Sequence, residues 1–154
     1  MPGTFPLNIY AYVRGNPISL IDPLGLTECD VDVAYAIAME LNPDLNFGTG
    51  RPIMDLPGPR EFGETFHAGE AHRVELGGDG YIHLSEFFAP ELGDHYAAIL
   101  FRTVIHEGLH FTLPLEIQSP ADNWNHSYIE PEAQWRADAG REAFLNARKV
   151  CSCP

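Results

Sequence analysis

Apolar residues recur at helical spacing in three stretches of the chain. The first is Asp30–Leu41, where acidic residues precede a run of apolar side chains. The second covers residues 95 to 111 and follows Asp94, a residue type that caps helices. The third covers residues 131 to 148, and Pro131 suits a first helical turn. The pattern therefore predicts three helices.

Strand signals lie between the first two predicted helices. Arg73–Leu76 and Tyr81–Leu84 flank a Gly-Gly-Asp-Gly turn, which predicts a β-hairpin. Residues 43 to 70 are rich in proline and glycine and are expected to form an irregular loop. We expect a small antiparallel sheet, and with the helices this gives an α+β fold.

The composition describes a globular chain of modest size. Its 154 residues are 45% hydrophobic and carry a net charge of −13, which repels phosphate backbones and argues against a nucleic-acid substrate. The sequence shows neither a stretch of 18 apolar residues nor a signal peptide, so we expect no membrane span. Cys29, Cys151 and Cys153 fit neither a zinc ribbon nor a disulfide framework, and we interpret them as incidental thiols.

The strongest functional signal is the pattern His-Glu-x-x-His, formed by His106, Glu107 and His110 inside the second predicted helix. Residues four apart lie on one face of a helix, so both imidazoles reach one ion while Glu107 points at its remaining coordination position. The pattern is typical of a zinc hydrolase. Gly108 inside this helix costs roughly 1 kcal/mol relative to alanine, and a close approach of the backbone at that point is one explanation.

A catalytic zinc ion normally takes three protein ligands, so a third ligand is expected after the motif. The candidates are Asp122, His126, Glu130, Glu132 and Asp138. Residues 130 to 140 (EPEAQWRADAG) resemble the second motif of gluzincin metallopeptidases, which is Glu-x-x-Ala or Ser followed by Asp or Asn on a later helix. This resemblance implies Glu130 as the third ligand, with Gln134 at the Asp or Asn position. Glu132 is the alternative, and Asp122 would make the chain similar to the aspzincins instead.

Peptide-bond hydrolysis is the natural reaction of such a site, with Glu107 taking the proton of water and passing it to the leaving amine. The developing oxyanion needs a donor, and the spacing does not separate the candidates Tyr96, His95, His126 and Tyr128. Tyr81–Leu84 is either an edge strand that pairs with an extended substrate or a core strand. The other histidines, His67, His72 and His83, are expected in loops or facing solvent.

Residues 8 to 26 (NIYAYVRGNPISLIDPLGL) differ from the acidic remainder of the chain. They resemble the end of the Rhs repeat-associated core domain. The resemblance implies that the Asp-Pro-x-Gly-Leu motif, which begins at Asp22, closes a β-cage whose aspartyl protease activity cuts the following toxin free. It therefore implies that residues 1–26 end an Rhs core and that residues 27–154 form a toxin domain.

Together these observations predict a zincin-like α+β domain, with a small antiparallel sheet packed on the active-site helix and a C-terminal ligand helix. The predicted function is that of a zinc-dependent endopeptidase toxin. The Rhs resemblance implies delivery by a specialised secretion apparatus without a signal peptide, a cognate immunity protein, and a protein substrate in the target-cell cytoplasm. Two alternatives stay open: a noncatalytic zinc-binding toxin that blocks a target, and a zinc hydrolase of a non-protein amide.

Overall fold

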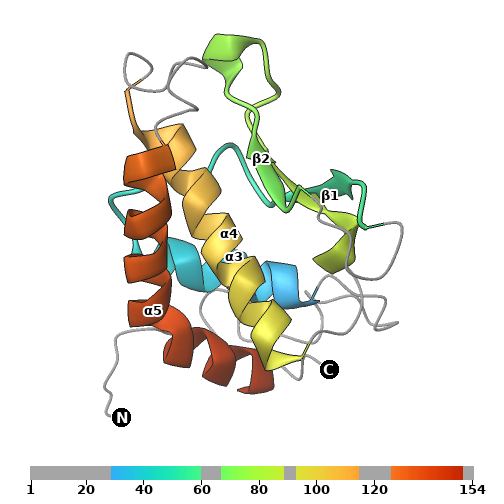
Figure 1. The fold of residues 1–154 in the computed structure, drawn as a ribbon, viewed down its shortest axis with the longest axis vertical. Coiled ribbons are helices and arrows are strands. Elements are labelled where there is room, and N and C mark those ends of the chain that lie inside the picture. Colours follow the sequence, from blue (N-terminus) through green and yellow to red (C-terminus); the bar gives the residue numbers. More distant parts are fainter. Residues whose placement is uncertain (1–28, 60–66, 89–92, 115–125, 151–154) are drawn as a thin grey trace.

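The computed structural model describes residues 29–59, 67–88, 93–114 and 126–150 (Figure 1). Within these residues the chain forms an α+β fold with three helices and a small three-stranded sheet. The Rhs-like segment and the predicted domain boundary after residue 26 lie outside the described residues, as does Asp122. Each helix that the structure describes is too short or too polar to span a bilayer.

The three predicted helices are confirmed as α3 (Cys29–Leu41), α4 (Asp94–Thr112) and α5 (His126–Val150). Gly93, and not Asp94, occupies the N-cap position of α4, and its carbonyl accepts from the backbone N–H of Ala97. Asp94 instead bonds Arg148 with its side chain. The predicted capping role of Asp94 is therefore wrong.

The last helix begins five residues before the predicted start, so Pro131 lies inside α5. Proline removes one backbone donor, which normally disfavours a helix interior. Ile129 and Ala133 on either side of it are fully packed in the core. Tertiary packing of this turn thus outweighs the missing hydrogen bond, and sequence propensity alone misplaces the helix start.

The sheet contains β1 (Ile53–Leu56), β2 (Gly69–Ala71) and β3 (Ile82–Ser85) in the order β1-β3-β2. β2 pairs antiparallel to β3, as the hairpin predicts, but β1 pairs parallel to β3, so the prediction of a purely antiparallel sheet is wrong. β1 arises inside the segment expected to be irregular. It is a partly exposed strand of four residues, and its short length leaves little periodic signal in the sequence.

The hairpin is displaced from its predicted position, because the predicted strand at residues 73–76 is a short 3-10 segment, η1 (Val74–Leu76). The antiparallel strand lies earlier, at β2, where a Cβ added to Gly69 would stand 2.8 Å from Cγ2 of Thr103 on α4. β2 therefore lies directly against α4 at a residue without a side chain. Hydrophobic periodicity does not report this kind of contact.

β3 pairs on both sides and all its residues are buried, so its interpretation as a substrate-binding edge strand is wrong and the core interpretation is confirmed. The edge beside α4 belongs to β2.

α4 is the central element of the fold, with α5 on one side and the sheet on the other (Figure 1). Its apolar face contributes Leu100, Phe101 and Val104 to a core shared with α3 and α5, and the rings of Phe101 and Phe144 stack at 4.8 Å. The helix that carries the His-Glu-x-x-His motif is therefore held from three sides.

One ion-pair network holds the helix ends together. The Arg148 guanidinium near the end of α5 donates to Asp30 at the start of α3 (2.6 and 3.1 Å) and to Asp94 at the start of α4 (3.0 Å). Cys29 is disulfide-bonded, so the interpretation of the cysteines as incidental thiols is wrong for this residue.

Candidate active site

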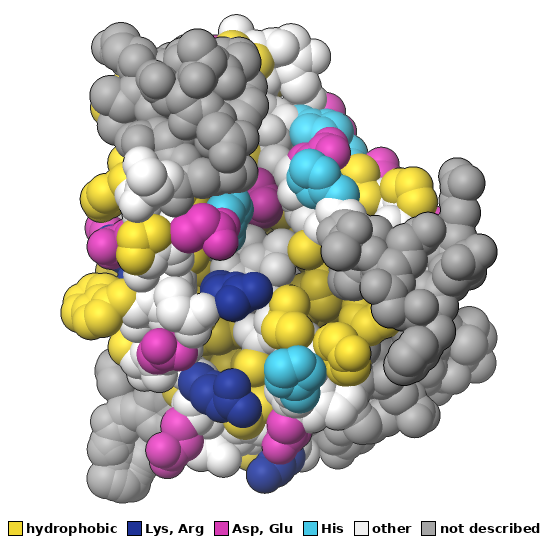
Figure 2. Space-filling view, viewed as in Figure 1, with side chains coloured by type: hydrophobic (Ala, Val, Ile, Leu, Met, Phe, Trp, Pro, Cys, Tyr) yellow, Lys and Arg dark blue, Asp and Glu magenta, His cyan; other side chains and the backbone are white. Residues whose placement is uncertain are grey.

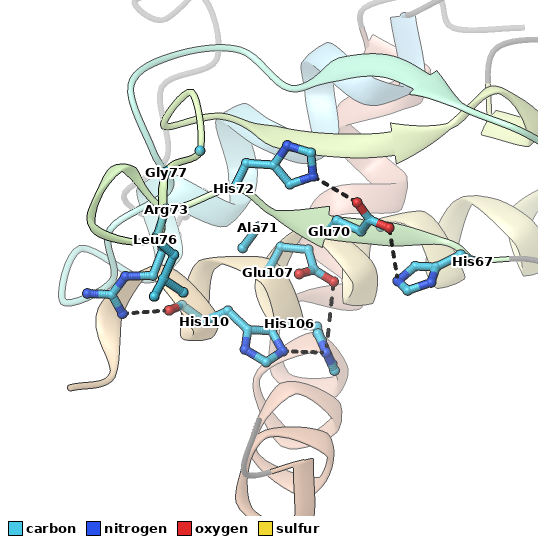
Figure 3. Close-up of a pocket in the computed structure, with 12 residues that line it drawn as sticks. His67, Glu70, Ala71, His72, Arg73, Leu76, Gly77, His106, Glu107 and His110 are labelled. Carbon is cyan, nitrogen blue, oxygen red and sulfur yellow. Dashed lines mark hydrogen bonds and ion pairs between the residues drawn. The ribbon is translucent and has the colours of Figure 1, made fainter. Parts of the chain in front are cut away.

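The motif places two imidazoles and a carboxylate together on α4 (Figure 3). Nε2 of His106 lies 3.2 Å from Nε2 of His110, and the two rings are tilted by 57° with centroids 4.9 Å apart. An oxygen of Glu107 lies 3.8 Å from Nε2 of His106. The ligand-type atoms of the three residues all lie within 4.8 Å of one another.

This donor set fits a zinc ion. Two nitrogens that each bind zinc at 2.0–2.1 Å in tetrahedral geometry stand about 3.3 Å apart, and the two Nε2 atoms of His106 and His110 are separated by 3.2 Å. Imidazole nitrogens and carboxylate oxygens are the ligands that catalytic zinc sites use.

The three motif residues line a cavity of about 470 Å³ between α4 and β2. The remaining lining residues come from β2 and from the residues just before and after it: His67, Gly69, Glu70, Ala71, His72, Arg73, Leu76, Gly77 and Gly78. This volume lies within the range of about 300–1,000 Å³ that is usual for ligand sites. The structure thus supplies an accessible space beside the motif.

Glu70, His67 and His72 are site residues that the sequence analysis missed. Glu70 lies between the two histidines, with Oε1 2.7 Å from Nε2 of His72 and Oε2 3.8 Å from Nε2 of His67 (Figure 3). Glu70 and His72 are two residues apart, a spacing that places side chains on the same face of a strand. That spacing was the available signal, but it identifies no site unless the strand is known to face α4.

Glu107 is almost completely buried, with 5% of its surface exposed. Burial, together with the negative charges of Glu70 and Glu130, raises the pKa of its carboxyl group to about 8. A carboxyl whose pKa lies near neutrality is suited to general acid–base chemistry. A cation beside it would offset the cost of its burial.

The structure distinguishes between the candidate third ligands on α5. Oε1 of Glu130 lies 2.7 Å from Nδ1 of His106, on the opposite side of the ring from the nitrogen that faces His110. Glu132 bonds instead to Nε of Arg136 at 2.8 Å. Only Glu130 of these two reaches the motif, and in this geometry it orients the His106 ring.

The other candidates do not reach the motif in the described part of the chain. Asp138 accepts a hydrogen bond from Gln134, whose oxygen accepts from Arg102, so the side-chain hydrogen bonds of both residues go to neighbours outside the motif. His126 begins α5, but its side chain lies outside the described residues.

The expected oxyanion donors do not line the cavity among the described residues. Tyr96 lies ten residues before His106 on α4, which is about 15 Å along the helix axis. His95 lines a different groove, and Tyr128 is exposed on α5. The donor side chains that line the cavity are His67, His72 and Arg73.

Arg73 supports the end of the motif helix. Its Nη1 donates to the backbone oxygens of His110 (2.9 Å) and Leu113 (2.6 Å), which lie at the C-terminus of α4 (Figure 3). The last carbonyls of a helix have no partners within it, and a cation there also opposes the negative end of the helix dipole. Arg73 therefore fixes the turn that carries His110.

His83 forms a second polar cluster next to the cavity. Its Nδ1 lies 2.8 Å from Asp55 and its Nε2 lies 2.8 Å from Asp79, while its ring stacks on His72 at 3.8 Å. The ligand-type atoms of His72, Asp79 and His83 also lie within 4.8 Å of one another, and Asp55 occupies the second nitrogen of His83. We interpret this cluster as a network of ion pairs that fixes His72.

This network predicts a pH-dependent contribution to stability. Burial lowers the pKa of His83, but its hydrogen bonds to Asp55 and Asp79 outweigh burial and raise the pKa above its usual value. The ion pairs of His83 therefore stabilise the fold fully at pH values below the pKa of histidine in the unfolded chain, which is about 6.5. This stabilisation is lost as the pH rises through the higher pKa that His83 has in the folded protein. We expect Asp79→Asn to lower the free energy of unfolding more at acidic pH, where His83 is protonated, than at alkaline pH, where it is neutral.

Urea unfolding at several pH values measures this difference. The matched control is Asp44→Asn, because Asp44 pairs with Arg136, whose charge does not change over this range. A loss at Asp79 that is as large at alkaline as at acidic pH would show that His83 is not the titrating partner.

Gly108 is required by a side chain that packs against α4. A Cβ at this position would lie 2.5 Å from Cε1 of Phe47, which is buried after α3. We expect Gly108→Ala to destabilise the fold by about 1–3 kcal/mol through overpacking, although helix propensity alone predicts a gain of about 1 kcal/mol. The same substitution in a Phe47→Leu background should cost less. Thermal unfolding of the four proteins measures the coupling, and a stabilised Gly108→Ala variant would contradict the contact.

Comparison with known proteins gives no match: no protein-family model, no curated protein and no solved structure is significantly similar to the chain. The Rhs-like segment and the gluzincin-like motif therefore stay resemblances seen in short stretches of sequence. The features that bear on function are the geometry of the motif, its buried carboxylate and its cavity.

Proposed function

We propose that this domain is a zinc-dependent endopeptidase with a zincin-like site, in which His106 and His110 hold the ion and Glu107 is the general base. The observation that carries the proposal is the nearly buried Glu107 carboxylate beside two Nε2 atoms 3.2 Å apart, all three residues lining one cavity. Polar residues with a purely structural role do not require an open cavity beside them.

Glu130 is the third ligand in this proposal. Its carboxylate bonds Nδ1 of His106, on the side of the ring away from His110, so a change of rotamer is needed to bring it to the ion. The side chain is 61% exposed, which leaves room for that rotation. Glu132 is committed to Arg136 and is the weaker candidate.

The chemistry divides between the ion and the side chains. A zinc ion supplies Lewis acidity, which polarises a carbonyl group and makes water acidic enough to lose a proton near neutral pH. Glu107 accepts that proton on its carboxylate and transfers it to the leaving amine. His72 lines the cavity with its ring held by Glu70 and His83, and it is the donor we assign to the developing oxyanion.

The biological setting of the proposal follows from the Rhs resemblance. The domain acts as a toxin that is delivered by a secretion apparatus, neutralised by an immunity protein in the producing cell, and directed at a protein in the target-cell cytoplasm. The disulfide bond of Cys29 favours the periplasm as an alternative compartment of action, because disulfides persist in oxidising compartments. Toxicity after expression in each compartment separates the two.

Zinc content is the first test of the proposal. We expect the purified protein to hold about one zinc ion per chain and His110→Ala to hold none. Removing a residue that only orients a zinc ligand typically weakens zinc binding by 10–100-fold. Removing a zinc ligand itself should weaken zinc binding by more than that. Glu130→Gln should therefore weaken zinc binding more than 100-fold, whereas the matched control Glu132→Gln should leave it unchanged. Equal zinc affinity in all four proteins would end the proposal.

The cleaved bond is tested in cells. We expect new protein termini in cells that express the wild-type domain and none in cells that express Glu107→Gln. Toxicity that survives in Glu107→Gln would favour a noncatalytic blocking toxin. Toxicity that depends on Glu107 but yields no new protein termini would favour hydrolysis of a non-protein amide.

A further inference from the structure

A groove between α4 and α5 gathers basic side chains on the same face as the candidate site. Its polar lining consists of His95 and Arg102 from α4 and of Gln134, Asp138 and Arg141 from α5. Figure 2 shows basic side chains and a histidine gathered where the two helices meet.

The two arginines of this groove differ from the other described arginines. Those others each pair with an aspartate or glutamate: Arg51, Arg73, Arg136 and Arg148. Arg102 and Arg141 form no ion pair with a described residue, although the chain has 22 acidic and only nine basic residues. Two guanidinium groups in one groove repel each other, and an anion bound between them removes that cost.

Gln134 separates the one acidic group of the groove from Arg102. Its oxygen accepts from Nη1 of Arg102 at 2.9 Å, and its nitrogen donates to Oδ1 of Asp138 at 2.8 Å. The amide therefore holds the Arg102 guanidinium in place without neutralising it. The charge of Arg102 stays free for a ligand.

The position of the groove relates it to the cavity. Arg102 lies four residues before His106 on α4, and Gln134 lies four residues after Glu130 on α5, so the groove begins one helical turn from the candidate site on both helices. Its volume of about 160 Å³ is below the 300 Å³ or so at which small-molecule sites begin. The groove has room for one side chain of a longer ligand.

We propose that this groove binds the carboxylate of an Asp or Glu side chain in an acidic polypeptide, with Arg102 and Arg141 as its charged donors and Gln134 as a positioning residue. The groove and the cavity share no lining residue, and they lie about one helical turn apart along α4 and α5. Binding of this polypeptide requires no hydrolysis, so it goes beyond the proposed peptidase function. Only the further step of identifying the bound polypeptide as the substrate rests on the proposed peptidase function.

Peptide binding to the full chain carrying Glu107→Gln tests the proposal without turnover. The probes are a fluorescent peptide of alternating Glu and Ser, a matched peptide of alternating Gln and Ser, and inorganic phosphate as a competitor, at about 0.15 M salt. We expect the Glu peptide to bind at least tenfold more tightly than the Gln peptide. Arg102→Gln and Arg141→Gln should each weaken Glu-peptide binding about tenfold, as expected for loss of a charged hydrogen bond.

The control variant is Lys149→Gln, which removes one positive charge from an exposed position of α5 outside the groove. It should bind the Glu peptide as well as the parent chain does. Equal binding of both peptides, or equal losses in Lys149→Gln and Arg141→Gln, would overturn the proposal. Arginine-dependent binding of phosphate without binding of the Glu peptide would make the groove a phosphate site and would also overturn it. None of these outcomes depends on zinc content or peptide hydrolysis, so the two proposals fail separately.

Discussion

Glu107→Gln should abolish toxicity and lower peptidase activity by about 10²–10⁴-fold while the protein keeps its zinc. The substitution preserves the shape of the side chain and removes only its ability to accept a proton. The two imidazoles that face each other at 3.2 Å are unchanged. Activity on a reporter peptide and zinc content, measured on the same preparation, check both halves of this expectation.

The same variant should unfold at a temperature no lower than that of the wild-type protein when both are stripped of metal. Burial and two neighbouring carboxylates raise the pKa of Glu107 to about 8, so at neutral pH the fold bears the cost of keeping this group nearly buried and protonated. A neutral amide avoids that cost. Loss of function with no loss of stability distinguishes a catalytic group from a structural one.

Glu86→Gln is the matched control, because it makes the same chemical change at an exposed residue that does not line the cavity. It should leave toxicity and activity at wild-type values. If Glu107→Gln keeps full activity, or loses its zinc together with its activity, Glu107 is not the general base.

The sequence predicts the local part of the site well. His106, Glu107 and His110 need only one turn of helix to converge, and helical periodicity predicted that helix. The link between Glu130 and His106 was also predictable in part, because a motif resemblance singled out Glu130, although the structure places its carboxylate on Nδ1 of the ring.

The remainder of the site depends on contacts between distant parts of the chain. Glu70 and His72 reach the cavity because β2 lies against α4 at Gly69, and nothing in the hydrophobic pattern marks that contact. Gly108 was expected to mark a close backbone approach, and the structure identifies the approaching group as the ring of Phe47. Periodicity reports which face is buried but not what covers it.

Arg148→Met should be the most destabilising single substitution among those discussed, lowering the free energy of unfolding by about 3–5 kcal/mol. It leaves the Asp30 carboxylate, which is 4% exposed, without the guanidinium that donates to both its oxygens. It also frees Asp94 at the start of the motif helix. Because a domain of this size is stable by only about 5–15 kcal/mol, urea unfolding under oxidising conditions should show a much lower midpoint.

The control is Arg51→Met, which breaks the ion pair between Arg51 and Asp32. Asp32 lies on α3, as Asp30 does, but this pair is at the surface, where the Arg51 side chain is 41% exposed. An exposed pair contributes about 0–1 kcal/mol, so this variant should unfold close to the wild-type midpoint. Adding Asp30→Asn to Arg148→Met should restore part of the loss, because the cost lies in a buried charge without its counterion and not in the missing contact alone. If the two arginine variants are equally stable, or if Asp30→Asn lowers stability further in the Arg148→Met background, burial of the Asp30 charge is not what makes Arg148 necessary to the fold.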